Sequence, residues 1–215
     1  RRVLFRSLFA AGFRAGDLIH NAFSYHFTPA GAMVDSGAAA LGCCVFPAGT
    51  GDTELQVQAI ADLQPCGYTG SPGFLHTLLE RAAELGTPTA SLKKALVSGE
   101  PLPVTLREAL RGYGVAVRQC YATSDLGLVA YETESEDGLV LDEQVIVEIV
   151  RPGTGDPLPD GEVGEVVVTT LNPDYPLIRF ATGDLSAYLP GYSACGRTNR
   201  RLRGWLGRAD QTTKV

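Results

Sequence analysis

The sequence predicts an α/β fold in which a mostly parallel sheet with flanking helices precedes an antiparallel, β-rich part. Two observations favour this prediction. From Asp17 to about Ser124, short apolar runs alternate with segments of helical periodicity, which is the pattern of consecutive β-α-β units. From Gly138 onward the apolar runs are separated by Gly, Pro and Asp without helical segments, which is typical of strands joined by tight turns. We expect an antiparallel sheet or a small barrel there.

We expect residues 1–135 to form the α/β subdomain, incomplete at its N-terminus, and residues 136–206 to form the β-rich subdomain. The segments expected to contain the strands of the first part are 17–23, 43–48, 66–70, 92–100 and 115–124. Helices are expected at 30–42, 52–64, 71–86 and 103–114. The second of these helices begins at a capping residue, Asp52, and carries apolar residues at roughly helical spacing, namely Leu55, Val57, Ile60, Ala61 and Leu63.

The β-rich part is expected to have its strands within four segments, 138–152, 161–171, 175–189 and 199–210. Glycines and prolines between the first two segments indicate a reversal of the chain. A loop that cradles phosphate is disfavoured there, because no helix follows to offer its N-terminus.

Composition narrows the function classes. The chain has 215 residues, 45% of them hydrophobic, which is enough to bury a core. A formal net charge of -6 argues against nucleic-acid binding, which needs clustered Lys and Arg, and the basic cluster Arg197–Arg208 is local. No apolar run approaches the roughly 20 residues that span a bilayer, and no leader pattern is present, so we expect a cytoplasmic protein without membrane contact.

Five cysteines occur without a CxxC pair or a histidine at ligand spacing, so we expect free, mostly buried thiols and no cysteine-bound metal. The sequence begins with RRVLFRSL rather than methionine and stops at TTKV without a capping signal. We therefore expect a piece of a longer protein.

Two expected strand ends carry polar side chains. In an open parallel sheet, ligands bind beyond the carboxyl ends of the strands. The segment VSGEPLP at 97–103 offers Gly99, which permits close backbone approach, and Glu100, which adds an acceptor. Taken alone, this segment is weak evidence for a site, and a plain turn from strand to helix is the favoured interpretation.

The segment QCYATSDLG at 119–127 carries a ring, a hydroxyl and a carboxylate in Tyr121, Thr123 and Asp125. A ring can stack on a base, a hydroxyl can bind a phosphate oxygen, and a carboxylate can hold a magnesium ion. These groups suit a nucleotide site, although a buried tyrosine beside a solvated turn is an alternative that the segment alone leaves open.

Five segments in this order, FSYHFTPAG, VSGEPLP, CYATSDLG, RFATGDLS and GRADQTTKV, resemble the motifs of the adenylate-forming superfamily of acyl-CoA synthetases. Within it the sequence is most similar to the phenylacetate-CoA ligase family. The resemblance covers nearly the whole chain and implies part of the large domain of such an enzyme. It also implies two steps, in which a carboxylate attacks the α-phosphorus of ATP and the thiol of CoA then displaces AMP. ATP, Mg2+ and CoA are the implied cofactors.

The resemblance also implies roles for individual residues. The nucleotide would be bound between the α/β part and the β-rich part. Gly99 and Glu100 would contact the adenine, and the Tyr121 ring would stack on it. Other nucleotide-binding residues of these segments would be Ser98, Pro101 and Ala122. Thr123 would bind the α-phosphate. Asp125 stands where the superfamily usually has glutamate, so as the shorter residue it is a weaker match for a magnesium ligand.

The last two motifs imply three further roles. Asp184 would hold the ribose hydroxyls, because one carboxylate can accept from two adjacent hydroxyls. Arg208 would contact ribose or phosphate and take part in catalysis with Thr123 and Asp125. Asp210 would be the hinge of a small carboxy-terminal domain, and residues 207–215 would begin that connection.

The aromatic segment Phe23, Tyr25, His26 and Phe27 would border the acyl pocket, where rings suit an aryl acid. A packed strand end, with His26 hydrogen-bonded in the core, is the alternative. His20 and His76 are expected to be structural or surface residues.

The superfamily's phosphate loop and its distal lysine are not found in the sequence, so we expect these 215 residues alone to be inactive or nearly so. Family members often form dimers, so a homodimer is compatible with the resemblance. Two alternatives remain, an adenylating enzyme that uses a flavin-like cofactor or a carrier protein as acceptor, and a nucleotide-binding module without catalysis. An NAD-dependent enzyme is disfavoured because no GxGxxG follows an early strand.

Overall fold

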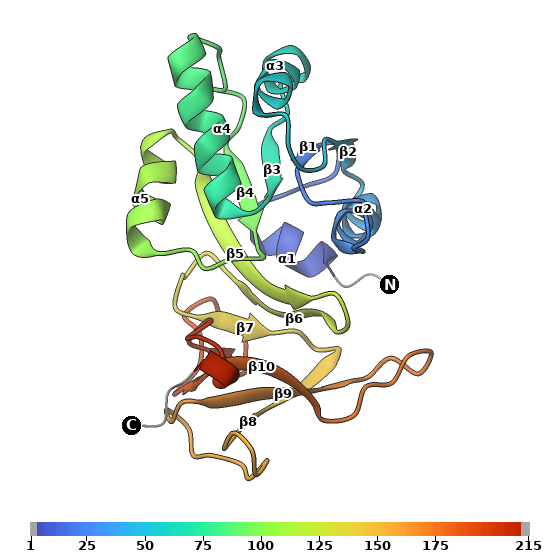
Figure 1. The fold of residues 1–215 in the computed structure, drawn as a ribbon, viewed down its shortest axis with the longest axis vertical. Helices are drawn as coiled ribbons and strands as arrows, with labels where there is room; N and C mark the ends of the chain where they lie inside the picture. The colour runs from blue at the N-terminus through green and yellow to red at the C-terminus, as the bar shows by residue number, and fades with distance from the viewer. Residues whose placement is uncertain (1–3, 212–215) are drawn as a thin grey trace. The chain divides into compact units, whose positions relative to one another are not determined.

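The structure is a computed structural model that describes residues 4–211 (Figure 1). The chain forms two compact units that divide between Cys120 and Tyr121. Residues 1–3, and residues 212–215 of the expected hinge, lie outside the described residues. Within the described part, no helix combines the length and the apolar character needed to cross a membrane.

The first unit is built on five parallel strands in the order β5-β4-β3-β1-β2. These strands are β1 (Leu18–Asn21), β2 (Cys44–Pro47), β3 (Gly67–Gly70), β4 (Lys94–Val97) and β5 (Ala116–Thr123), of which β5 continues into the second unit. The helices are α1 (Phe5–Ala10), α2 (Ala30–Leu41), α3 (Thr53–Leu63), α4 (Pro72–Leu85) and α5 (Val104–Gly112). The predicted alternation of strands and helices over this part is confirmed.

Local chemistry fixes the ends of these helices. The side chain of Asp52 accepts a hydrogen bond from the Leu55 amide at the start of α3, and Ser71 caps α4 in the same way. Helices α2 and α4 end at Gly42 and Gly86, whose left-handed conformation suits glycine.

Helices α3, α4 and α5 pack on the sheet (Figure 1), and their apolar faces form one buried core with β3, β4 and β5. The largest buried side chains of this core include Tyr68, Ile60, Leu75, Leu78, Leu79, Leu92 and Leu110. Leu55 and Leu63, which the helical spacing placed on the apolar stripe of α3, are exposed instead. The apolar stripe of this helix is therefore narrower than the sequence predicted, and Val57 and Ile60 pack in the buried core.

The second unit contains two antiparallel arrangements of strands. One has the order β11-β12-β7-β6 and is formed by β6 (Gly127–Glu132), β7 (Leu139–Leu141), β11 (Tyr188–Leu189) and β12 (Arg201–Leu202). The other is a three-stranded sheet of β8 (Val145–Val150), β9 (Gly164–Thr170) and β10 (Phe180–Ser186). A short 3-10 helix, η1 (Ala209–Gln211), follows. The expectation of antiparallel strands after Gly138 is confirmed, and β6 is an additional strand that the sequence pattern did not indicate.

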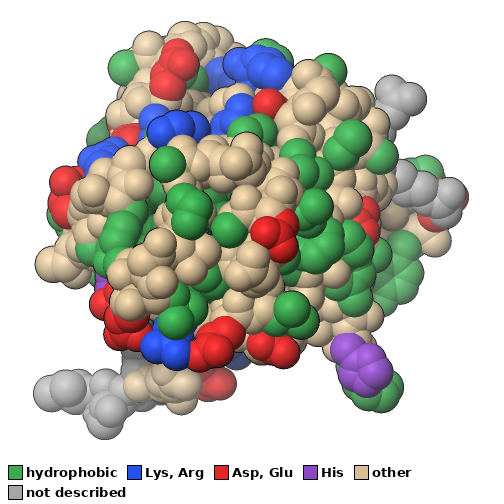
Figure 2. All heavy atoms as spheres, turned by 90° about the horizontal axis from the view of Figure 1, so that it is seen from above, with side chains coloured by type: hydrophobic (Ala, Val, Ile, Leu, Met, Phe, Trp, Pro, Cys, Tyr) green, Lys and Arg blue, Asp and Glu red, His purple; other side chains and the backbone are tan. Residues whose placement is uncertain are grey.

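On the face shown in Figure 2, basic and acidic side chains are interspersed. Among residues 4–211, no group of three or more His, Cys, Asp or Glu side chains is arranged to hold a metal ion. The five cysteines are free thiols, and only Cys120 is buried, so the expectation of mostly buried thiols is wrong.

Candidate functional site

A bulge in strand β10 presents Asp184. Ala181 pairs with Val167 of β9 and Leu185 pairs with Glu165, so three residues of β10 oppose a single residue of β9. The middle residue, Gly183, has φ +73°, a conformation that favours glycine. Bulges of this kind redirect a side chain away from the regular alternation of the strand, and they are frequent beside functional sites.

Hydrogen bonds fix the conformation of this bulge. The Thr182 hydroxyl donates to the Val166 carbonyl at 2.9 Å and accepts from the Asp184 amide at 3.1 Å. The Gly183 amide donates to a Glu165 carboxylate oxygen at 3.2 Å. The backbone that carries Asp184 is therefore held in place before any ligand binds.

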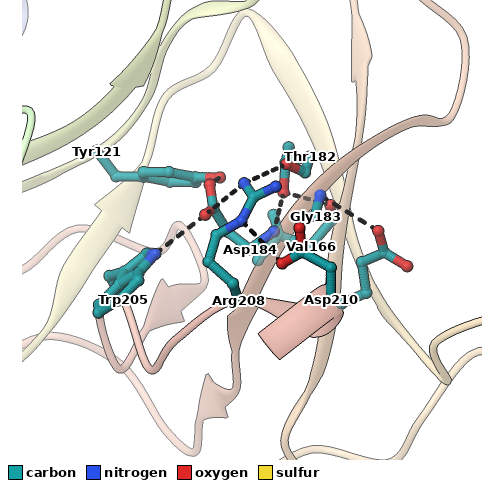
Figure 3. A network of polar contacts seen from close by, with 9 residues as sticks. Tyr121, Val166, Thr182, Gly183, Asp184, Trp205, Arg208 and Asp210 are labelled. Atoms are coloured by element: carbon teal, nitrogen blue, oxygen red, sulfur yellow. Dashed lines mark hydrogen bonds and ion pairs between the residues drawn. The ribbon is translucent and has the colours of Figure 1, made fainter. Parts of the chain in front are cut away.

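Three side chains donate hydrogen bonds to the Asp184 carboxylate (Figure 3). The Tyr121 hydroxyl lies 2.8 Å from Oδ2, the Trp205 indole nitrogen 3.0 Å from Oδ1, and Arg208 Nη1 3.2 Å from Oδ1. The Asp184 side chain keeps 14% of its surface exposed. We call these four residues the Asp184 cluster. It holds one carboxylate, partly neutralised by a guanidinium, at a place that a ligand can reach.

Arg208 is tied to the bulge by more than its bond to Asp184. Its Nη1 also donates to the Thr182 carbonyl at 3.1 Å, and its Nε lies 3.4 Å from Asp210 Oδ1. Hydrogen bonds to Asp210 and Asp184 raise the pKa of Arg208. A Cβ atom at Gly183 would lie 2.6 Å from Arg208 Nη2, so only glycine lets the guanidinium lie this close to the strand.

Tyr121 acts as a donor because it remains protonated. Burial, and also the neighbouring Asp184 carboxylate, raise the pKa of its phenol. The ring packs against the apolar core of the second unit. The alternative reading of a packed tyrosine therefore describes its ring, while its hydroxyl belongs to the cluster.

The end of β5 and the turn that follows it carry the other two expected residues of this region, Thr123 and Asp125. The Thr123 hydroxyl oxygen accepts from the Leu126 amide at 3.0 Å, which holds the turn and leaves the hydroxyl hydrogen to donate elsewhere. Asp125 is exposed in that turn. One exposed carboxylate suits a magnesium ion that is bound mainly by phosphates, because Mg2+ commonly takes one or two carboxylates plus phosphate oxygens.

In the first unit, the expected adenine segment follows β4. Ser98 is buried and its hydroxyl donates to the Cys120 carbonyl at 2.9 Å. Gly99 has φ +87°, as a turn at this strand end requires. Glu100 Oε1 accepts from the Gly73 amide at 2.7 Å, in the first turn of α4, and Pro101 is exposed. Glu100 therefore has a structural partner of its own.

The aromatic segment after β1 is anchored through Tyr25. Its hydroxyl donates to Asp35 Oδ1 at 2.7 Å and accepts from Asn21 Nδ2 at 2.8 Å. Phe23 is half-buried, whereas His26 and Phe27 are exposed and their rings meet edge to face. Exposure of His26 contradicts the alternative in which this histidine lies hydrogen-bonded in the core.

Sequence reasoning missed the two residues that organise these places. Asn21 is fully buried and donates to Tyr25, and Trp205 donates to Asp184. A polar residue at the end of an apolar strand could have indicated Asn21. No pattern near Trp205 indicated its contact, because the partner lies 21 residues earlier in the chain.

Known proteins share the sequence pattern and the fold of this chain. The AMP-binding enzyme family matches residues 9–172, which is more than half of the chain. The chain belongs to this family. The expected resemblance to phenylacetate-CoA ligases is also confirmed. The chain is 37% identical to the phenylacetate-coenzyme A ligase of Thermus thermophilus and 35% identical to that of Aromatoleum evansii, in each case over 97% of this chain. It spans about half the length of these curated relatives, 48% of each.

Solved structures of two CoA ligases share the fold. A 2-hydroxyisobutyryl-CoA ligase in complex with its acyl adenylate and CoA has a TM-score of 0.90 at 27% identity. The similarity covers 100% of this chain and 49% of that one. An anthranilate CoA ligase, AuaEII, has a TM-score of 0.72 at 17% identity and supports the fold alone. The α/β and antiparallel parts predicted from the sequence therefore correspond to those of an adenylate-forming enzyme.

Proposed function

We propose that a protein containing this chain is an ATP-dependent acid-thiol ligase. It activates an aryl carboxylic acid, phenylacetate or a close relative, as the acyl adenylate with release of pyrophosphate, and then transfers the acyl group to CoA with release of AMP. Family membership and the names of the curated relatives support this reaction. The Asp184 cluster is the observation that carries it.

A carboxylate in the position of Asp184 suits the ribose of a nucleotide. It is accessible, its backbone is fixed by the bulge, and its two oxygens can accept from adjacent hydroxyls. Arg208 is the charged group beside it, and we assign it contact with ribose or phosphate. We assign the Tyr121 ring and Ala122 to the adenine, and the Thr123 hydroxyl to the α-phosphate.

The chemistry at the α-phosphorus requires positioning and neutralisation of negative charge. Asp125 would hold a magnesium ion, which supplies positive charge at the phosphates when it is bound. Thr123 would donate to a phosphate oxygen as charge develops there. Asp210, hydrogen-bonded to Arg208, is assigned to the hinge of the domain movement between the two steps.

In the first unit, we assign the segment Ser98, Gly99, Glu100 and Pro101 to the adenine side of the nucleotide. The hydrogen bonds of Ser98 and Glu100 to other parts of the unit hold this segment in its conformation. We assign the aromatic segment to the acyl group. There the anchored Tyr25 and the exposed rings of His26 and Phe27 offer aromatic surface to an aryl acid.

A panel of carboxylic acids tests the proposal on the full-length protein that contains this chain. We expect phenylacetate or a related aryl acid to stimulate exchange of pyrophosphate into ATP, and CoA to be required for release of AMP at multiple turnovers. The proposal is wrong if no acid stimulates exchange. Exchange without a requirement for CoA would instead identify an adenylating enzyme that uses another acceptor.

A further inference from the structure

The Asp184 carboxylate has little remaining capacity to accept hydrogen bonds. A carboxylate offers about four lone-pair positions on its two oxygens. Oδ2 accepts from Tyr121, and Oδ1 accepts from both Trp205 and Arg208. About one position is therefore uncommitted, whereas two adjacent hydroxyls need two. A ribose can bind this carboxylate through both hydroxyls only if one of the three protein donors leaves.

Tyr121 and Arg208 are the donors that further contacts hold in place. The Tyr121 ring packs against the buried core of the second unit. Arg208 makes additional bonds to Thr182 and Asp210, and its backbone forms a bridge with that of Asp184. Withdrawal of either side chain would break contacts besides the one to the carboxylate.

Trp205 is the donor that can leave at least cost. Its backbone is fixed, since the Leu206 amide donates to the Leu185 carbonyl at 2.9 Å and the Gly204 carbonyl accepts from Ser186 Oγ at 2.7 Å. The residue, however, keeps 45% of its surface exposed. Rotation about the side-chain bonds would release Asp184 into contact with a ligand without moving the backbone, and such rotations are fast for exposed residues.

We propose that Trp205 is a displaceable partner of Asp184. Its indole N–H takes the position of one ribose hydroxyl and leaves that position when an adenosine nucleotide binds. This inference rests on the proposed function, because it takes the ligand to be such a nucleotide. Trp205 therefore lowers the affinity for ribonucleotides, and it lowers it less for a ligand with a single ribose hydroxyl, which fits the uncommitted position.

Trp205→Phe tests this inference because it removes the N–H and keeps an aromatic ring. We expect the 215-residue chain with this substitution to bind AMP about tenfold more tightly than the unaltered chain in calorimetry. Binding of 2′-deoxy-AMP should change little. Tyr192→Phe is the matched control, because it removes one polar group from an exposed aromatic residue of the same unit outside the cluster. Its AMP affinity should equal that of the unaltered chain.

Trp205 is the only tryptophan of the sequence, so its fluorescence provides a second readout. We expect AMP to shift the emission of the unaltered chain with the dissociation constant found by calorimetry. The inference is wrong if AMP binds without changing the fluorescence. It is also wrong if Trp205→Phe fails to tighten AMP binding, or tightens binding of both nucleotides equally. Failure of every variant to bind AMP would contradict the nucleotide site itself, and this inference with it.

Discussion

The two units of the chain use their polar side chains differently. In the second unit, Tyr121, Trp205 and Arg208 converge on one accessible carboxylate, Asp184. In the first unit, Asn21 and other polar side chains at the strand ends bind and fix segments of their own unit. The difference separates two kinds of effect. Substitutions in the Asp184 cluster should affect ligand binding more than folding, and those at the strand ends of the first unit should affect folding first.

Asp184→Asn should have the largest effect on binding. The amide keeps the size of the side chain, but it loses the charge and replaces one acceptor oxygen with a donor. We expect the AMP affinity of the chain to fall about a hundredfold, because the hydrogen bonds from the two ribose hydroxyls lose their charged acceptor. The amide keeps one acceptor oxygen for the donors of the cluster, so we expect the melting temperature to change less than the affinity does.

Calorimetry with AMP and thermal unfolding measure these two quantities, and Glu162→Gln supplies an exposed carboxylate-to-amide control in the same unit. A large loss of stability with unchanged affinity per folded molecule would make Asp184 a structural residue. That result would remove the distinction between the two units.

Asn21→Ala should have the largest effect on folding. Asn21 is fully buried, accepts from the Thr69 hydroxyl at 3.0 Å, and donates to Tyr25 and to the Gly31 carbonyl. Its removal leaves buried polar groups without partners, which costs about 2–3 kcal/mol of the free energy of unfolding.

Urea unfolding followed by far-UV circular dichroism measures this loss, since the α-helices of residues 4–211 all lie in the first unit. Asn172→Ala is the control, because Asn172 is exposed in the β9–β10 connection and should change stability by less than about 1 kcal/mol. Equal effects of the two substitutions would show that the strand end of β1 is not held by Asn21.

The sequence predicted the first unit well because local signals coincide there with the fold. Capping residues such as Asp52 and Ser71 stand where the helical spacing of apolar residues begins. The alternation of helices and strands can therefore be recognised in the sequence. Strand β6 was not predicted, because it follows β5 after a turn of only three residues, 124–126, that contains no Gly or Pro.

The candidate site was also predicted only in part from the sequence. Tyr121, Asp184 and Arg208 were named from the order of motifs, and their side chains meet in the structure, while their roles remain predictions. The contact of Trp205 with Asp184 depends on how the segment after β12 lies against the β10 bulge. A contact of this kind between residues far apart in the chain produces no local sequence pattern that could predict it.

His20 extends the comparison to pH. It is fully buried, Nε2 hydrogen-bonds to Gln56 Oε1 at 2.8 Å, and it contacts the rings of Phe46 and Tyr68. Burial lowers its pKa below the ordinary value, despite the bond to Gln56. The unfolded chain therefore gains a proton near pH 6.5 that the folded chain does not, and stability should fall by up to about 1.4 kcal/mol per pH unit below that point.

The measurement is urea unfolding between roughly pH 7.5 and 5.5 for the unaltered chain and for His20→Gln, which cannot titrate there. We expect acidification to lower the free energy of unfolding less in His20→Gln than in the unaltered chain. His76→Gln, at a half-buried site beside Glu80, should lose as much stability on acidification as the unaltered chain does. An unchanged slope in His20→Gln would mean that groups elsewhere govern the acid sensitivity.

Glu100→Gln should have the smallest effect and gives the sharpest test of the comparison. Glu100 accepts from the Gly73 amide in the first turn of α4, where a negative charge interacts favourably with the helix dipole. Glutamine keeps an acceptor and loses the charge, so the free energy of unfolding should fall by only about 0.5 kcal/mol. If Glu100 serves mainly its own unit, AMP affinity should change by less than about threefold. A tenfold loss of AMP affinity at unchanged stability would place Glu100 among the nucleotide-binding residues and would show that a carboxylate of the first unit serves the ligand as directly as Asp184 does.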